Sequence, residues 1–143
     1  MKNKKLFIRL SGALLILLLM GGCNENPSVA NLFFPVTQAP ASQHMDSLAT
    51  GKLVAEGNIL GVKSGWFFDK GDVLIWPYGY SLGTQNARIC VIDSEGQVVA
   101  KVGDSIKLGG GEISRELAEE QIGRPLPSDI SGSFWLIGSV IKN

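Results

Sequence analysis

The sequence predicts a mainly β fold, a small OB-like barrel of five to six strands with one short helix before the last strand. Its apolar runs are short, and they are separated by segments rich in glycine, of which the chain has 18. Such strands close on themselves because exposed sheet edges invite aggregation, and glycines at positions 57, 61 and 138 can supply the bends that closure needs. A small β-sandwich is the alternative fold.

One domain is predicted over residues 50–143, which is enough chain for a modest core. Its first strand is expected over residues 53–62, with a break at Gly57. The second covers residues 73–76 and ends at Pro77, because proline has no N–H to donate to a strand ladder.

A hairpin is predicted at the centre of the domain, with strands over residues 87–92 and 97–102. Asp93 favours the first position of the turn between them, and Gly96 tolerates the left-handed conformation at its end. Cys90 lies in the first of these strands, where a small, soft side chain is typical of a buried filler.

The last third of the chain is predicted as strand, helix, strand. Residues 105–108 form a strand that the triple glycine of residues 109–111 breaks. Ser114 then caps a helix over residues 115–122. The final strand covers residues 134–141, with one interruption.

The N-terminus begins with four basic residues, continues with the apolar residues 10–20, and reaches Cys23 through two glycines. The basic residues hold the start of the chain in the cytoplasm while the apolar run enters the bilayer. This arrangement resembles a bacterial lipoprotein signal, in which residues 1–22 are removed and Cys23 receives a lipid.

That resemblance has two departures, because Met20 and Gly21 stand where such signals usually carry Leu and then Ala or Ser. An uncleaved membrane anchor and an ordinary secretory signal are therefore the alternatives. The apolar run is shorter than the ~20 residues that span a bilayer, which favours cleavage. We expect the protein on a bacterial cell membrane or outer membrane, facing away from the cytoplasm.

Residues 23–49 are predicted to be the lipidated cysteine and a tether, because Asn, Ser, Pro, Gln, Thr and Ala dominate there. The triplet Leu32-Phe33-Phe34 is too apolar for a solvated spacer. We expect it to dock on the domain or on a partner.

Charge limits the partners. The chain has 13 basic and 13 acidic residues, and the signal removes four of the basic ones, so the mature part has nine basic residues and a net charge of −4. It shows no basic cluster, so we expect no nucleic acid as a partner. Attachment to the membrane is expected through lipid on Cys23, and the partner is expected to be an envelope protein or glycan.

Trp76, Tyr78 and Tyr80 alternate along the chain and share one face if the chain is extended. Aromatic rings of this kind stack on sugars, and Ser81 is placed to serve a hydroxyl group. We therefore name Tyr78, Tyr80 and Ser81 as candidate ligand-binding residues. Core packing is the alternative for these rings.

Glu112 directly follows the triple glycine and is the fourth candidate ligand-binding residue. The segment lacks the Lys-Ser/Thr of a phosphate loop, and Glu112 would repel a phosphate. A carboxylate there can instead accept hydrogen bonds from a sugar hydroxyl or an amide. A carboxylate-dependent hydrolase of wall polymer that uses Glu112 is a further alternative.

No metal site, cofactor or catalytic residue is predicted, and we expect the protein not to be an enzyme. His44 is the single histidine, so neither a zinc site nor a Cys/His or Ser/His/Asp set can be assembled. The acidic pairs at residues 69/72 and 93/95 are too small for calcium and are expected to form turns.

Five segments, residues 74–82, 91–93, 98–104, 108–112 and 134–138, resemble those of uncharacterised small bacterial secreted or lipid-anchored proteins. That resemblance implies a location and a fold but no activity. The sequence thus favours a lipid-anchored extracytoplasmic binding or interaction module, with a structural or assembly accessory of the envelope as the alternative.

Overall fold

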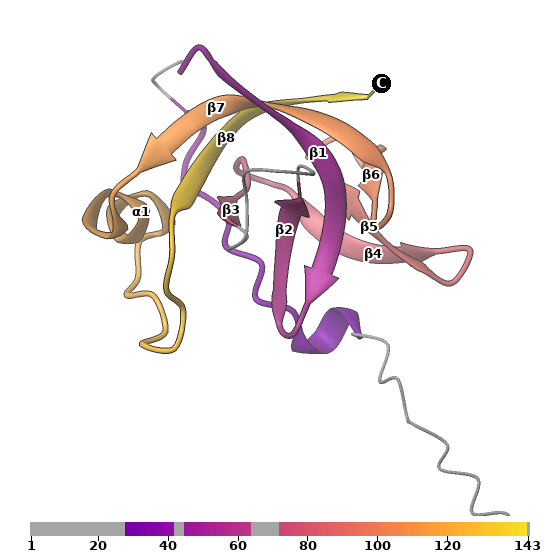
Figure 1. Ribbon diagram of the computed structural model, residues 1–143, viewed down its shortest axis with the longest axis horizontal. Coiled ribbons are helices and arrows are strands. Elements are labelled where there is room, and N and C mark those ends of the chain that lie inside the picture. The colour runs from indigo at the N-terminus through magenta and orange to yellow at the C-terminus, as the bar shows by residue number, and fades with distance from the viewer. Residues whose placement is uncertain (1–27, 42–44, 64–71, 143) are drawn as a thin grey trace, which may run out of the picture.

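The computed structural model describes residues 28–41, 45–63 and 72–142, which form two β-sheets and one α-helix (Figure 1). The larger sheet has five strands in the order β2-β1-β7-β8-β3, and the smaller has three in the order β4-β5-β6. In chain order the elements are η1 (Val29–Asn31), β1 (Ser47–Glu56), β2 (Ile59–Lys63), β3 (Val73–Ile75), β4 (Ser81–Gln85), β5 (Arg88–Ile92), β6 (Val98–Lys101), β7 (Ser105–Ile113), α1 (Arg115–Ile122) and β8 (Phe134–Lys142). Paired strands are antiparallel except β3 and β8, which are parallel.

The five-stranded sheet curls into a half-barrel, and β1 and β7 curve strongly along their length (Figure 1). Alternate residues of its strands point to the inner side, where they pack against the three-stranded sheet. The buried residues of this inner core are Leu53, Leu60, Val62, Leu74, Trp76, Val91, Ala100, Ile106, Leu108 and Ile137. Burial of this apolar surface is the main stabilising contribution to the fold.

The helix α1 covers one part of the outer side of the same sheet. Its buried residues Ala118 and Ile122 belong to a second apolar cluster with Val73, Ile75, Ile113, Leu126, Ile130 and Phe134. The helix starts after Ser114, whose Oγ accepts a hydrogen bond from the Leu117 N–H at 3.2 Å, and Gly123 ends it at a φ of 69°. These two caps confirm the predicted helix.

Residues 33–38, which we call the N-terminal strap, lie between the two edge strands of the half-barrel, β2 and β3. Phe33 forms a parallel bridge with Ile59 of β2, and Val36 forms one with Trp76, directly after β3. The strap therefore connects two edges that do not pair with each other in the sheet.

Backbone hydrogen bonds fix the strap along its length. The Thr37 N–H donates to the Trp76 carbonyl oxygen at 2.9 Å, and the Trp76 N–H donates to the Pro35 carbonyl oxygen at 2.9 Å. At its end, the Gln38 N–H donates to the carbonyl oxygen of Gln121 near the end of α1, also at 2.9 Å. The folded domain thus begins before the predicted boundary at residue 50, and part of the predicted tether belongs to it.

Two residues of the apolar triplet, Phe33 and Phe34 at the start of the strap, dock on the domain, which is one of the two predicted outcomes. Phe34 packs against the inner core, and its ring stacks on Trp76 with centroids 5.3 Å apart. Phe33 packs against the outer cluster. Pro35, which follows, is fully buried.

The prediction of a mainly β, barrel-like domain with one helix before the last strand is confirmed. The described strands number eight rather than five to six. Residues 53–62 belong to two antiparallel strands, because Gly57 has a φ of 58° and turns the chain back. Residues 81–85 form β4, a half-exposed strand that the apolar pattern did not indicate.

The prediction that the triple glycine breaks its strand is wrong, because the three glycines lie inside β7. The pairing of β7 with β8 shifts between Gly109 and Gly110, and Gly138 has no opposite residue in the register. A Cβ atom on Gly110 would collide with the Leu136 carbonyl oxygen. Glycine is needed here because the two backbones approach closely at a bulge, which bends both strands.

Candidate functional site

The predicted aromatic face at residues 76–80 does not exist, because the chain turns instead of running straight. The Tyr80 N–H donates to the Pro77 carbonyl oxygen at 3.2 Å, and Gly79 between them has a φ of 81°. Trp76 is fully buried, and Tyr80 stacks on it with ring centroids 6.2 Å apart. Tyr78 alone is directed to solvent, with 53% of its surface exposed.

Tyr80 and Ser81 lie at the entry to β4, and they differ in exposure. Tyr80 is half-buried, and burial together with the negative charge of Asp93 raises the pKa of its hydroxyl. Ser81 is exposed and pairs with Ile92 of β5. Tyr80 is thus part of the core stack, Ser81 follows it at the surface, and the two residues do not extend a ring platform.

Glu112 lies in the other sheet, exposed on β7 and paired with Trp135 of β8. Its charge acts on Asp72, whose pKa is raised by burial first and by Glu112 second, against a hydrogen bond with Ser133 that lowers it. The structure therefore brings Glu112 together with a second carboxylate and not with the tyrosines at β4.

The two cysteines differ in what the structure shows of them. Cys90 on β5 is buried, with 1% of its surface exposed, and is free, so the predicted filler role is confirmed. Cys23 and His44 lie outside the described residues. Lipidation of Cys23 stays a prediction.

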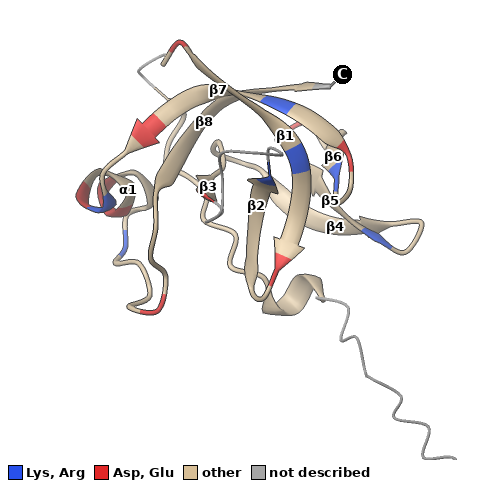
Figure 2. Cartoon of the chain, in the orientation of Figure 1, with Lys and Arg blue, Asp and Glu red and all other residues tan. Residues whose placement is uncertain are grey.

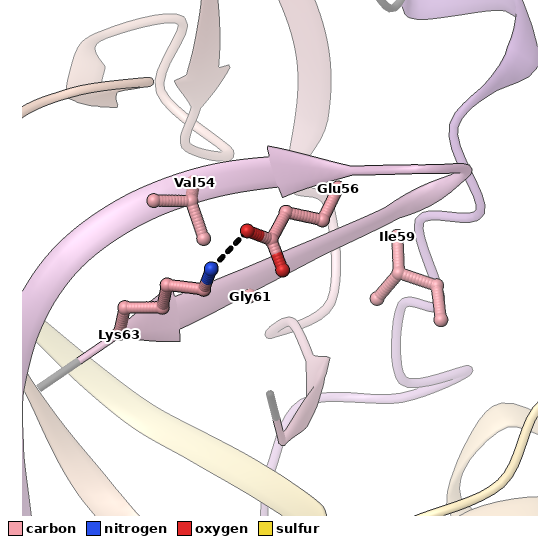
Figure 3. A pocket seen from close by; sticks show the side chains of 5 residues that line it. All are labelled: Val54, Glu56, Ile59, Gly61 and Lys63. Carbon is pink, nitrogen blue, oxygen red and sulfur yellow. Dashed lines mark hydrogen bonds and ion pairs between the residues drawn. The ribbon is translucent and has the colours of Figure 1, made fainter. Parts of the chain in front are cut away.

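The β1–β2 hairpin carries a surface hollow that the sequence did not predict (Figure 3). We call it the hairpin hollow. Its volume is about 160 Å³, and it is lined by Val54, Glu56, Ile59, Gly61 and Lys63. Val54 pairs with Gly61, and Glu56 pairs with Ile59, so these side chains share one face of the hairpin. The missing side chain at Gly61 leaves the space between the two apolar residues.

Alternation along both strands explains why these residues face outward. Leu53 and Leu60 are buried in the inner core, and so is Val62. Their neighbours Val54, Gly61 and Lys63 must then point to the outer side of the half-barrel. On that side α1 packs over β3, the end of β7 and the start of β8, and Ile59 of the hollow is partly buried against the same apolar cluster.

An ion pair between Glu56 and Lys63 borders the hollow (Figure 3). The two side chains come from opposite strands, and about half of each is exposed, 59% for Glu56 and 48% for Lys63. An exposed pair of this kind contributes little to stability. The pair places one hydrogen-bond donor, Lys63, and one acceptor, Glu56, beside an apolar surface.

Two of the residues that line the hollow, Val54 and Ile59, are aliphatic. Its apolar walls suit one aliphatic or aromatic group, since a cavity of about 150 Å³ is enough to hold benzene. Within the described residues, no three His, Cys, Asp or Glu side chains come together where they could hold a metal ion. The described basic and acidic residues are interspersed along the strands (Figure 2).

One sequence feature could have indicated the hollow. Glycine stands between two outward positions of β2, Ile59 and Lys63, and a strand face with large, absent and large side chains has a gap. A single strand over residues 53–62 does not place Val54 opposite Gly61, so the predicted strand does not indicate the hollow.

Comparison with models of known protein families, with curated protein sequences and with solved structures finds no match to this chain.

None of the helices in the described part of the chain is both long and apolar enough to span a membrane.

Proposed function

We propose that this protein is a lipid-anchored extracytoplasmic binding module of the bacterial envelope, attached through Cys23, and that the hairpin hollow receives a side chain of a protein partner. The observation that carries the binding role is the hollow itself. It combines apolar walls, a glycine floor and an ion pair at its border, on the outer face of the β1–β2 hairpin.

A protein partner is favoured over a glycan by the position of the aromatic rings. Sugar sites need accessible rings to stack on, but Trp76 is buried and Tyr80 stacks on it. Tyr78 is the one exposed ring of that segment. The hollow is lined by Val54 and Ile59 instead, and aliphatic walls of this size suit a single apolar side chain.

Anchoring is tested by the intact mass of the protein from the membrane fraction of an expressing bacterium. The proposal expects the mass of residues 23–143 plus diacylglycerol, with or without an added acyl chain. Cys23→Ser is the matched control and should leave the fold unchanged but abolish the lipid mass. An uncleaved or lipid-free wild-type chain contradicts the proposal.

Binding is tested by photocrosslinking in whole cells with a photoreactive amino acid at position 54, in the hollow. The control carries the same amino acid at the exposed Glu116 of α1, away from the hollow. We expect a protein adduct at position 54 that Gly61→Phe removes, because the new ring fills the hollow. Identical adducts at both positions, or adducts that survive Gly61→Phe, contradict the proposal.

A further inference from the structure

We infer that the surface around η1 and the β1–β2 turn faces the bilayer that holds the anchor, so that the partner of the hairpin hollow lies at the membrane surface. We call this surface the turn face and define it as residues 28–32 and 57–58. The inference rests on the proposed anchoring. In this arrangement the domain is held close to the membrane and is not displayed far from it on a long tether.

The number of residues between anchor and domain carries the argument. Five residues separate Cys23 from Val29, where η1 begins. Extended chain spans at most ~3.3–3.6 Å per residue, so the anchor and η1 are about 20 Å apart at most. A tether that continued to residue 49 would reach roughly 90 Å at the same rise. The shorter limit applies because residues 33–38, the strap, are bound to the domain and do not add to the reach of the tether.

Contacts of the strap fix which part of the domain is held close. The Phe33 N–H donates to the Asn58 carbonyl oxygen at 2.6 Å, and Phe33 bridges Ile59, which lines the hollow. Figure 1 shows η1 directly beside the β1–β2 turn. The anchor therefore approaches the domain at this turn and not at the far end of β1.

The charge of the turn face suits a bilayer surface. Residues 28–32 and 57–58 are all uncharged, and Val29 and Leu32 add partly exposed apolar surface. The nearest acid in sequence, Glu56, is paired with Lys63. Anionic headgroups are thus neither repelled nor attracted strongly, and the anchor alone has to supply the binding energy.

The opposite end of the same strand provides an internal reference. β1 has ten residues and rises about 3.3 Å per residue, so its start lies up to ~30 Å from its end. Leu48 near that start is 59% exposed. A probe at Leu48 and a probe at Asn58 therefore sample two distances from the membrane.

The experiment uses the lipidated full chain in vesicles of phosphatidylethanolamine and phosphatidylglycerol that contain a lipid with a nitroxide on its headgroup. A fluorophore is attached to Asn58→Cys in one sample and to Leu48→Cys in another. Native Cys90 is buried and does not label in the folded protein. Asn58→Cys keeps the backbone carbonyl that binds Phe33.

We expect several-fold stronger quenching of the fluorophore at position 58 than at position 48. Inserting a flexible Gly/Ser linker of about 15 residues after Ser28 should remove that difference, because the domain can then move away and turn freely. Equal quenching at both positions, or a difference that survives the linker, overturns the inference.

Flotation of the vesicles separates this inference from the proposed function. Protein that fails to float with the vesicles lacks the anchor, and the proposed function fails together with the inference. Protein that floats but is quenched equally at positions 58 and 48 is anchored, and the orientation alone is wrong. Thermal melting of both cysteine variants and of the linker variant checks that each is folded.

Discussion

The aromatic stack inside the half-barrel and the hairpin hollow on its outside show opposite uses of side-chain size. In the stack, the rings of Phe34, Trp76 and Tyr80 fill the interior between the strap, the segment after β3 and the entry to β4. The hollow, of about 160 Å³, is lined by Gly61 together with its apolar neighbours Val54 and Ile59. The large side chains fill the core, and the position without a side chain lies at a surface hollow.

This comparison indicates which positions of a small β domain are available for a binding site. Large aromatic residues contribute most of the apolar surface, so a short chain with few of them uses them first to fill its core. A site then arises where the strand pattern omits a side chain on an outward face.

Trp76→Ala should lower the free energy of unfolding by about 3–5 kcal/mol, because it removes a fully buried ring that two other rings contact. Tyr78→Ala, only two residues away and 53% exposed, should change it by no more than about 0.5 kcal/mol. Urea denaturation of both variants measures the contrast. Similar losses at the two positions would mean that the ring of Tyr78 is also packed.

Gly110→Ala should cost about 1–3 kcal/mol, because the added methyl group collides with the Leu136 carbonyl oxygen and forces the bulge apart. Gly61 is itself buried but lines the hollow, so its added methyl group should enter that space, and Gly61→Ala should stay within about 0.5 kcal/mol of the wild type. Thermal melting of the two glycine variants distinguishes a glycine that the fold needs from one that the site needs. Equal destabilisation by both would contradict the assignment of Gly61 to the hollow.

Two charge pairs differ in their expected effect on stability, which is smaller than the effects above. Glu56 and Lys63 at the hollow carry opposite charges, whereas Asp72 and Glu112 carry like charges. Because burial and Glu112 raise the pKa of Asp72, its ionised form lowers stability at neutral pH. This cost disappears as the pH falls through the folded pKa and below the unfolded one.

Asp72→Asn should therefore have a higher melting temperature than the wild type at pH 7, and the difference should narrow on acidification to about pH 3. Melting of both proteins across this range measures it. A lower melting temperature for Asp72→Asn at pH 7 would show that the hydrogen bond with Ser133 outweighs the two opposing causes. Glu56→Gln at the hollow should show no comparable gain at neutral pH.

The sequence was sufficient for elements that depend on local chemistry. The turn at residues 93–96 forms as predicted, since Asp93 Oδ1 accepts hydrogen bonds from the N–H groups of Glu95 and Gln97 at 2.9 and 2.8 Å. The helix capped by Ser114 also forms as predicted. Both depend on residues within a few positions of one another.

What the sequence did not show depends on contacts between distant segments. Pro35 lies in a stretch whose composition is typical of a linker, yet a carbonyl group there accepts a hydrogen bond from Trp76. Val54 pairs with Gly61 because the chain turns back at Gly57, where the sequence predicted only a break in one strand. Composition and periodicity carry no information on such pairings, so the strap and the hollow could not be predicted.

Native-state hydrogen exchange at Thr37 and Trp76 tests most directly whether the strap is part of the folded domain. These two amides form the hydrogen bonds that connect the strap to the segment after β3. Our account predicts protection factors close to those of the amides of β7, because all these bonds open together when the domain unfolds. Exchange of both amides at the rate of an unstructured peptide, while β7 stays protected, would contradict it.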